Sequence, residues 1–163
     1  MKILGIDPGI GRLGWGVIGV HGSSFTVHSF GCIETKATLS VEARLLQIYT
    51  TLTEIIEKEK PEALAVEELF FNTNVTTAMV VGQARGVVLL LGAQHNLSVG
   101  IYTPLQVKVA VTGFGRAEKA QVGQMVKVIL KLPAVPKPDD TADALAVAIT
   151  HAFSYKTLRV KEG

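Results

Sequence analysis

The chain has 163 residues, of which 48% are hydrophobic and 18% are charged. These values exclude a disordered chain, a coiled coil or a low-complexity tail as the main content, and they allow one domain with a sizeable core. The net charge of +2 does not by itself distinguish between classes of partner.

Features that would place the chain outside the cytoplasm are weak. The single cysteine, Cys32, cannot form an intramolecular disulfide, which favours a reducing compartment. Asp7 precedes any long apolar run, so we expect no secretory signal. The longest apolar stretch, Val75–Leu91, contains Gln83 and Arg85. We therefore expect a cytoplasmic protein without a membrane span.

The first part of the chain predicts three strands. Lys2–Asp7 is short and apolar, and it ends at a Pro-Gly pair that is typical of a turn. The segments Leu13–His21 and Ser24–Thr35 are separated by a short turn that contains Gly22. We expect these strands to form an antiparallel meander.

Helices and two further strands alternate in the remainder. Leu45, Ile48 and Leu52 recur at helical spacing within the helix Ser40–Lys60, for which Ser40 is the expected N-cap. The other expected elements are a strand at Ala63–Glu67, a helix at Asn74–Gln94, a strand at Ser98–Tyr102 and helices at Pro104–Val111, Glu118–Lys131 and Asp139–Ser154. This order predicts a single α/β domain over residues 1–163 with a five-stranded mixed sheet flanked by helices.

The helix Asn74–Gln94 is apolar on nearly every side. Such a helix is buried on more than one face, so we expect one face to meet the sheet and another to meet a second subunit. Arg85 within it should be paired or at an interface. His151, in the last helix, lies too far along from Asp140 to share a metal with it. We expect His151 to be a helix C-terminal cation or a polar surface residue.

Four acids are candidates for one site. Asp7 and Glu67 each end an apolar strand, although either residue alone is more often a solvated acid. Asp140 and Asp143 project from one face at the start of the last helix. The helix dipole explains Asp140 well, but Asp143 precedes an apolar run, where an acid needs a partner or a metal.

If the four acids meet, cations must neutralise them. Oxygen ligands suit Mg²⁺ or Mn²⁺, and two such ions roughly 4 Å apart can activate a water and stabilise the leaving oxygen of a phosphodiester. The rest of the chain would then be basic, as suits a nucleic acid partner.

The motifs resemble those of one family. GIDPG at 5–9, AVEELF at 65–70, GQARG at 82–86, GFGRAEKAQV at 113–122 and DDTADALAVAITH at 139–151 look like the bacterial RuvC family of Holliday junction resolvases. The resemblance implies a ribonuclease H-like fold and a homodimer. It also implies a Mg²⁺-dependent endonuclease, in which Mn²⁺ substitutes and two ions bind per subunit. Such enzymes nick two like-polarity strands of a four-way DNA junction symmetrically, leave 5′-phosphates and work beside RuvA and RuvB.

The resemblance also assigns roles to residues. Asp7, Glu67, Asp140 and Asp143 match the family acids and are the expected catalytic residues and metal ligands. Lys108 and Lys119 match basic residues near the scissile phosphate, and Lys119 is also expected to be catalytic because it would support the phosphate's developing charge. Phe70 matches a family aromatic that meets bases near the crossover, whereas Phe71 is a second aromatic that departs from the family pattern, so either ring could contact bases. The expected DNA-binding residues are Phe70, Phe71, Asn74, Lys108 and Lys119.

Two other functions remain open from the sequence. GIDPGIG fits loosely the first phosphate loop of ATP-binding enzymes of the actin and sugar-kinase type, but we find no second loop of that kind. A junction-binding module that does not cut DNA would keep the fold, but four retained acids argue against it because their repulsion is costly without a metal.

Overall fold

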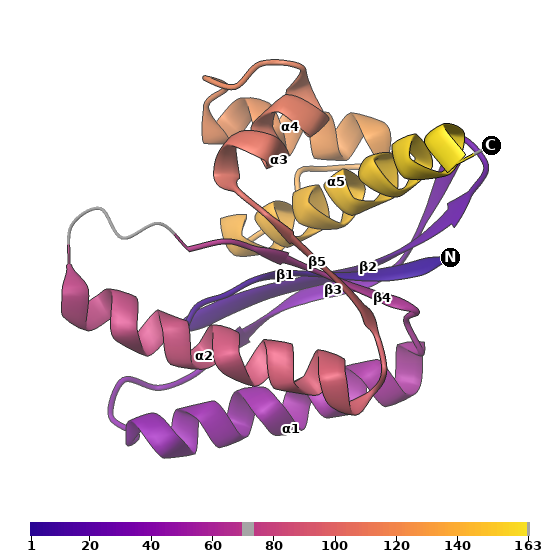
Figure 1. Ribbon diagram of the computed structural model, residues 1–163. Coiled ribbons are helices and arrows are strands. Elements are labelled where there is room, and N and C mark those ends of the chain that lie inside the picture. The colour runs from indigo at the N-terminus through magenta and orange to yellow at the C-terminus, as the bar shows by residue number, and fades with distance from the viewer. Residues whose placement is uncertain (70–73, 163) are drawn as a thin grey trace.

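A five-stranded sheet lies at the centre of the computed structural model, which describes residues 1–69 and 74–162 (Figure 1). Its strands are β1 (Lys2–Asp7), β2 (Arg12–His21), β3 (Ser24–Glu34), β4 (Ala63–Glu67) and β5 (Ser98–Tyr102). The spatial order is β3-β2-β1-β4-β5. The first three strands pair antiparallel, whereas β1, β4 and β5 run parallel. The predicted meander and mixed sheet are confirmed.

Helices cover both faces of the sheet (Figure 1). The helices are α1 (Val41–Glu59), α2 (Val75–Gln94), α3 (Pro104–Thr112), α4 (Lys119–Ile129) and α5 (Asp139–Glu162). The first two lie below the sheet in this view, and the other three lie above it. The predicted end of the last helix at Ser154 is wrong, because α5 continues to Glu162. No glycine or proline between these two residues interrupts the helix.

Side chains alternate between the two faces along each strand. Ile3 of β1 and Ala63 and Ala65 of β4 pack against α5, whereas Leu4 and Ile6 belong to the core on the α1 and α2 side. Continuing this alternation places Asp7 and Glu67 on the face that α5 covers. The ends of two parallel strands therefore present acids to the same helix.

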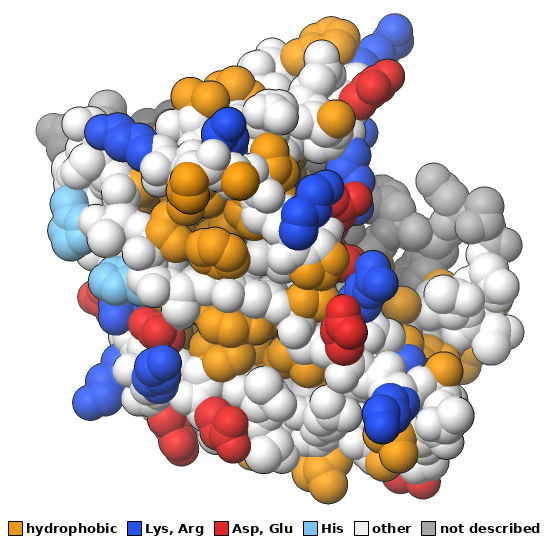
Figure 2. Space-filling view, turned by 180° about the vertical axis from the view of Figure 1, so that it is seen from behind, with side chains coloured by type: hydrophobic (Ala, Val, Ile, Leu, Met, Phe, Trp, Pro, Cys, Tyr) orange, Lys and Arg blue, Asp and Glu red, His pale blue; other side chains and the backbone are white. Residues whose placement is uncertain are grey.

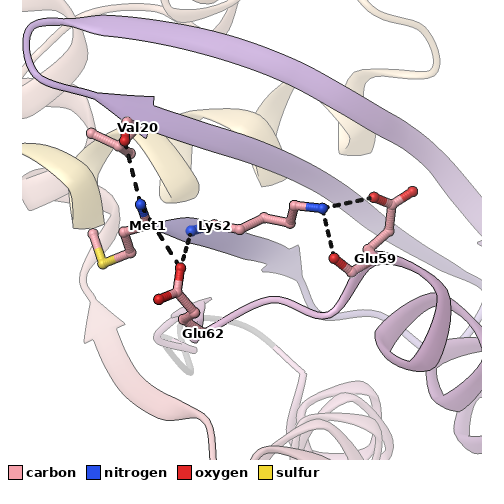
Figure 3. Close-up of polar contacts among 5 residues, drawn as sticks. All are labelled: Met1, Lys2, Val20, Glu59 and Glu62. Carbon is pink, nitrogen blue, oxygen red and sulfur yellow. Dashed lines mark hydrogen bonds and ion pairs between the residues drawn. The ribbon is translucent and has the colours of Figure 1, made fainter.

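The opposite end of β1 is held by polar contacts (Figure 3). The Lys2 ammonium donates to the Glu59 carbonyl oxygen at 2.7 Å and lies 3.7 Å from the Glu59 carboxylate. The Lys2 backbone N–H donates to Glu62 at 2.8 Å, and the N-terminal ammonium lies 3.8 Å from the same carboxylate. These contacts fix the start of β1 against the end of α1 and the start of β4.

The expectation for His151 is wrong. Its side chain is 7% exposed, lies in the middle of the longer α5 and forms a 2.9 Å hydrogen bond between Nδ1 and the Tyr102 hydroxyl. Burial lowers the pKa of His151, so it is not a helix-terminal cation. The sequence pattern alone does not show that the neighbouring strand offers a hydroxyl partner.

Helix α2 has the length and apolar composition of a membrane span, with a mean hydropathy of 1.5, despite Gln83 and Arg85. Gln83 and Arg85 therefore do not exclude a span by composition alone. In the fold, Ala84, Val88 and Leu91 are buried in the core on the α1 side of the sheet. A core helix meets the same criterion, so the feature is weak evidence for a membrane.

Candidate active site

Parallel pairing brings the first two acids together. Ile6 of β1 pairs with Val66 of β4, so Asp7 and Glu67 are the next residues of adjacent strands. Asp140 and Asp143 lie in the first turns of α5, which crosses the same face of the sheet. The charges of Glu67, Asp143 and Asp140 all raise the pKa of Asp7. The four predicted acids therefore lie within electrostatic reach of one another.

Burial and mutual repulsion disfavour ionisation of the strand-end acids. The pKa of Asp7 is raised to about 8, first by burial and then by the charges of Glu67, Asp143 and Asp140. The pKa of Glu67 is raised to about 7 by burial and by Asp143, although Lys119 and a hydrogen bond with Asp7 partly oppose the rise. In the absence of another cation, burial and the neighbouring charges therefore favour at least one proton on this pair at neutral pH.

Lys119 forms an ion pair with one of the acids. It is the first residue of α4, and its ammonium lies 2.8 Å from an Asp143 carboxylate oxygen. Burial raises the pKa of Asp143, whereas this ion pair lowers it. The same hydrogen bond raises the pKa of Lys119. Lys119 thus supplies one positive charge to a cluster that needs more than one.

Two hollows flank the Lys119–Asp143 ion pair. One, of about 220 Å³, is lined by Glu67, Lys108, Lys119 and Asp143 together with apolar side chains of α3, α4 and α5. The other, of about 320 Å³, extends from the same ion pair towards Lys137. The Lys108 charge also lowers the pKa of Glu67. The two predicted lysines therefore lie beside the acids, where a phosphate could approach.

The donor set suits a hard divalent cation, because it consists of carboxylate oxygens only. Within residues 1–69 and 74–162, however, no three Asp, Glu, His or Cys side chains are already arranged to hold one ion. The acids instead interact with one another and with Lys119. Burial, and after it the neighbouring negative charges, raise the pKa values of Asp7 and Glu67, and a bound cation would favour the ionised form of both acids.

The structure describes only some of the predicted DNA-contacting residues. Phe70 and Phe71 lie outside the described residues. The Asn74 side chain caps α2, accepting from the backbone N–H groups of Thr76 at 3.1 Å and Thr77 at 3.4 Å. Asn74 therefore has a clear local role in helix initiation.

Sequence reasoning missed Tyr102. Its backbone carbonyl accepts from Glu68 N–H at 2.7 Å, and it pairs with Glu67 across β4 and β5. Its hydroxyl contacts His151 of α5, so Tyr102 links the strand beside Glu67 to the helix that carries Asp143. The only sequence signal is its position at the carboxyl end of the strand next to the one that ends in Glu67.

Comparisons with known proteins agree with this arrangement. The family described as crossover junction endodeoxyribonuclease RuvC matches residues 3–151. The chain belongs to the RuvC family. The RuvC of Alkaliphilus metalliredigens is 56% identical over 154 residues, which are 94% of each chain. The RuvC of Brevibacillus brevis is 50% identical over 163 residues, which are 100% of this chain and 98% of that one.

A solved structure extends the comparison to the fold. Thermus thermophilus RuvC in complex with Holliday junction substrate has a TM-score of 0.92 and 39% sequence identity, with 96% of each chain covered. The predicted ribonuclease H-like fold and RuvC family membership are confirmed. The prediction of an endodeoxyribonuclease, a hydrolase of DNA phosphodiester bonds, is confirmed by the family.

Proposed function

We propose that this chain resolves four-way DNA junctions, and that Asp7, Glu67, Asp140 and Asp143 form its catalytic centre. The observation that carries the proposal is the convergence of four acids at a buried site, where burial and then the charges of Glu67, Asp143 and Asp140 raise the pKa of Asp7 to about 8. Such a cluster is unfavourable in a protein that only binds DNA, but it suits a site completed by cations. The relatives named above supply the type of substrate.

The four carboxylates would hold Mg²⁺, with two ions per subunit and Mn²⁺ as a substitute. Bound cations would supply activation of a water and neutralisation of charge on the phosphate and on the leaving oxygen. The protein's part is to hold four oxygen donors at the end of a rigid sheet and to place Lys119 beside them. A cation that binds Asp143 would compete with the Lys119 ion pair and leave the ammonium available to the scissile phosphate.

Lys108 would contact the DNA backbone from the other side of the smaller hollow, which it lines together with Glu67. Phe70 and Phe71 follow Glu67 closely in the chain, and an aromatic ring there is suited to stack on an unpaired base. Asn74 would contact DNA only through atoms that its capping interaction leaves available. Hydrophobic patches are interspersed with both signs of charge on the face shown in Figure 2, which offers no uniform basic surface.

A homodimer would place two such sites on a two-fold symmetric junction, so that two strands of like polarity are nicked and 5′-phosphates are left. Helix α2 offers the surface for this association. Val75, Met79 and Leu90 on α2 are 77%, 63% and 53% exposed. Added Cβ atoms at Gly82 and Gly86 would meet nothing within 4 Å, so a second backbone could approach there. The Arg85 Nε is buried and has no hydrogen-bond partner in the described part of the chain.

The chain would act in the cytoplasm, beside the branch-migration proteins RuvA and RuvB. This part of the proposal rests on the family resemblance, and it is tested by co-sedimentation of the chain with a RuvA–RuvB–junction complex.

The catalytic assignment is tested with a labelled four-way junction and Mg²⁺. We expect Asp7→Asn to reduce nicking by about 10³-fold or more, because the site loses one ligand. Binding of the junction in EDTA should be kept or become stronger, because a negative charge is removed. Glu62→Gln, at the other end of β1, is the matched control and should cut at the wild-type rate. Wild-type nicking by Asp7→Asn would refute the assignment.

The dimer is tested by Met79→Glu on the exposed face of α2. A buried charge without a partner at an interface should shift a dimer to a monomer in light scattering at micromolar concentration. Nicking of both strands in one binding event should be lost with it. Val128→Glu, on an exposed position of α4, is the control and should leave the mass unchanged. A monomeric wild-type chain would contradict the proposal.

A further inference from the structure

The first turns of α5 pack directly on glycine residues of the strands beneath them. A Cβ atom added at Gly14 would overlap the carbonyl oxygen of Asp140 and lie 3.0 Å from the Thr141 nitrogen. A Cβ atom added at Gly5 would overlap the Ala144 carbonyl oxygen and lie 2.9 Å from the Ala148 nitrogen. Glycine inside a strand is typical of such a close backbone approach.

These two glycines are neighbours of Asp7 in the sheet. Gly14 pairs directly with Asp7 across β1 and β2, and Gly5 precedes Asp7 by two residues, so it lies on the same face of β1. Asp140, whose backbone rests on Gly14, is one of the four acids. Ala144, whose backbone rests on Gly5, follows Asp143 directly. The two contacts therefore set the height of the acid-bearing turns of α5 above Asp7.

We propose that Gly14 is a positioning residue for the metal-binding acids, with Gly5 in a supporting role. This role of Gly14 rests on the proposed function of the four carboxylates. A methyl group at Gly14 meets backbone, which no side-chain rotation can relieve, so the start of α5 would have to move by about 1 Å. Mg²⁺ requires near-ideal octahedral geometry, and groups that orient its ligands typically account for a 10- to 100-fold change in metal affinity.

Gly16 provides a matched control on the same strand and the same face. A Cβ atom there would lie 2.5 Å from the Leu145 Cδ2 and 2.8 Å from its Cγ. It would therefore press on the buried side chain of Leu145, whereas Gly14 faces the backbone of Asp140 and Thr141. Gly16→Ala and Gly14→Ala make the same chemical change beneath the same helix, but only the second pushes on the backbone that carries an acid.

The test measures binding of Mn²⁺ alone, without DNA, by the loss of the free-ion signal in electron paramagnetic resonance. We expect Gly14→Ala to weaken binding by 10-fold or more, and Gly16→Ala to stay within about twofold of wild type. Junction affinity in EDTA should be unchanged in both variants. The Mg²⁺ concentration for half-maximal nicking should rise only in Gly14→Ala. Equal Mn²⁺ affinity in the two glycine variants, with a lower melting temperature alone, would overturn the proposal.

Two further variants distinguish failure of the positioning role from failure of folding or of the proposed function. If Gly14→Ala does not fold, Gly5→Ala takes its place with the same expected contrast to Gly16→Ala. Asp7→Asn separates this inference from the function on which it rests. Loss of Mn²⁺ binding in Asp7→Asn with unaltered binding in the glycine variants overturns only the positioning role. Absence of Mn²⁺ binding by the wild-type chain overturns the proposed function itself.

Discussion

The two ends of β1 place acidic side chains in opposite environments. At the amino end, Glu59 and Glu62 each lie next to a cation, the Lys2 ammonium and the N-terminal ammonium (Figure 3). At the carboxyl end, Asp7 and Glu67 are buried beside further acids and have raised pKa values. At the first end each acid has a cation beside it, whereas at the second the Lys119 ion pair involves only one of the four acids. The two ends of one six-residue strand thus differ in how well their charges are balanced.

Substitution of one lysine at each end of β1 should separate the two ends most clearly. Lys119→Met removes the ammonium beside Asp143, and we expect the nicking rate at saturating Mg²⁺ to fall by about 10²- to 10³-fold, because charge that develops on the phosphate loses a donor. Lys2→Met removes the equivalent partner of Glu59 and should leave the rate within twofold. Single-turnover cleavage of a labelled junction measures both. Similar rates for the two variants would mean that Lys119 is only a structural partner of Asp143.

The acids at the carboxyl end of β1 should also make metal binding depend on pH. Asp7 and Glu67, with pKa values raised to about 8 and about 7, hold protons that a metal must displace. The affinity for Mn²⁺ should therefore rise between pH 6 and pH 9, by up to about 10-fold per pH unit for each proton released. Calorimetric titration in buffers of different ionisation enthalpy would count these protons. Glu62→Gln should show the same pH profile, and a pH-independent affinity would contradict the raised pKa values.

The sequence predicted the parts of the molecule that follow from local patterns. The strand Ala63–Glu67 and the cap at Ser40 follow from apolar periodicity and from a side chain that satisfies a free backbone group. The placement of Asp7 beside Glu67 could be predicted because parallel strands end at the same edge of a sheet. The acids themselves were grouped with the help of motifs that resemble a family.

Contacts between distant segments could not be predicted in this way. The burial of His151 depends on a hydroxyl 49 residues earlier in the chain, and its helix position alone indicated a polar surface residue. The Lys119–Asp143 ion pair depends on how α4 crosses α5, which no periodicity specifies. The closeness of Gly14 to Asp140 depends likewise on the packing of α5 on the sheet. Each is a tertiary contact between residues that have ordinary neighbours in sequence.

Substitution of Asp7 should also change the melting temperature of the chain without metal, by a small amount. The pKa of Asp7 is higher in the folded chain than its ordinary value, so the folded state binds more protons than the unfolded state between about pH 4 and pH 8. Stability from protonated Asp7 is present at low pH and is lost as pH rises through about 8. In EDTA at pH 9, Asp7→Asn should therefore melt above wild type, by about 2–4 °C for each kcal/mol of repulsion removed, and the difference should shrink towards pH 5.

Glu62→Gln should change stability in the opposite direction. This carboxylate accepts from the Lys2 N–H and lies 3.8 Å from the N-terminal ammonium, with a side chain that is 68% exposed. An exposed pair contributes about 0–1 kcal/mol, so its loss should lower the melting temperature slightly. Addition of Mg²⁺ at pH 9 should stabilise wild type and Glu62→Gln but not Asp7→Asn, because only an intact acid cluster gains from binding the ion. If both substitutions lowered the melting temperature in EDTA at pH 9, the carboxyl end of β1 would be as well balanced in charge as the amino end. The proposal that cations complete the acid cluster would then fail.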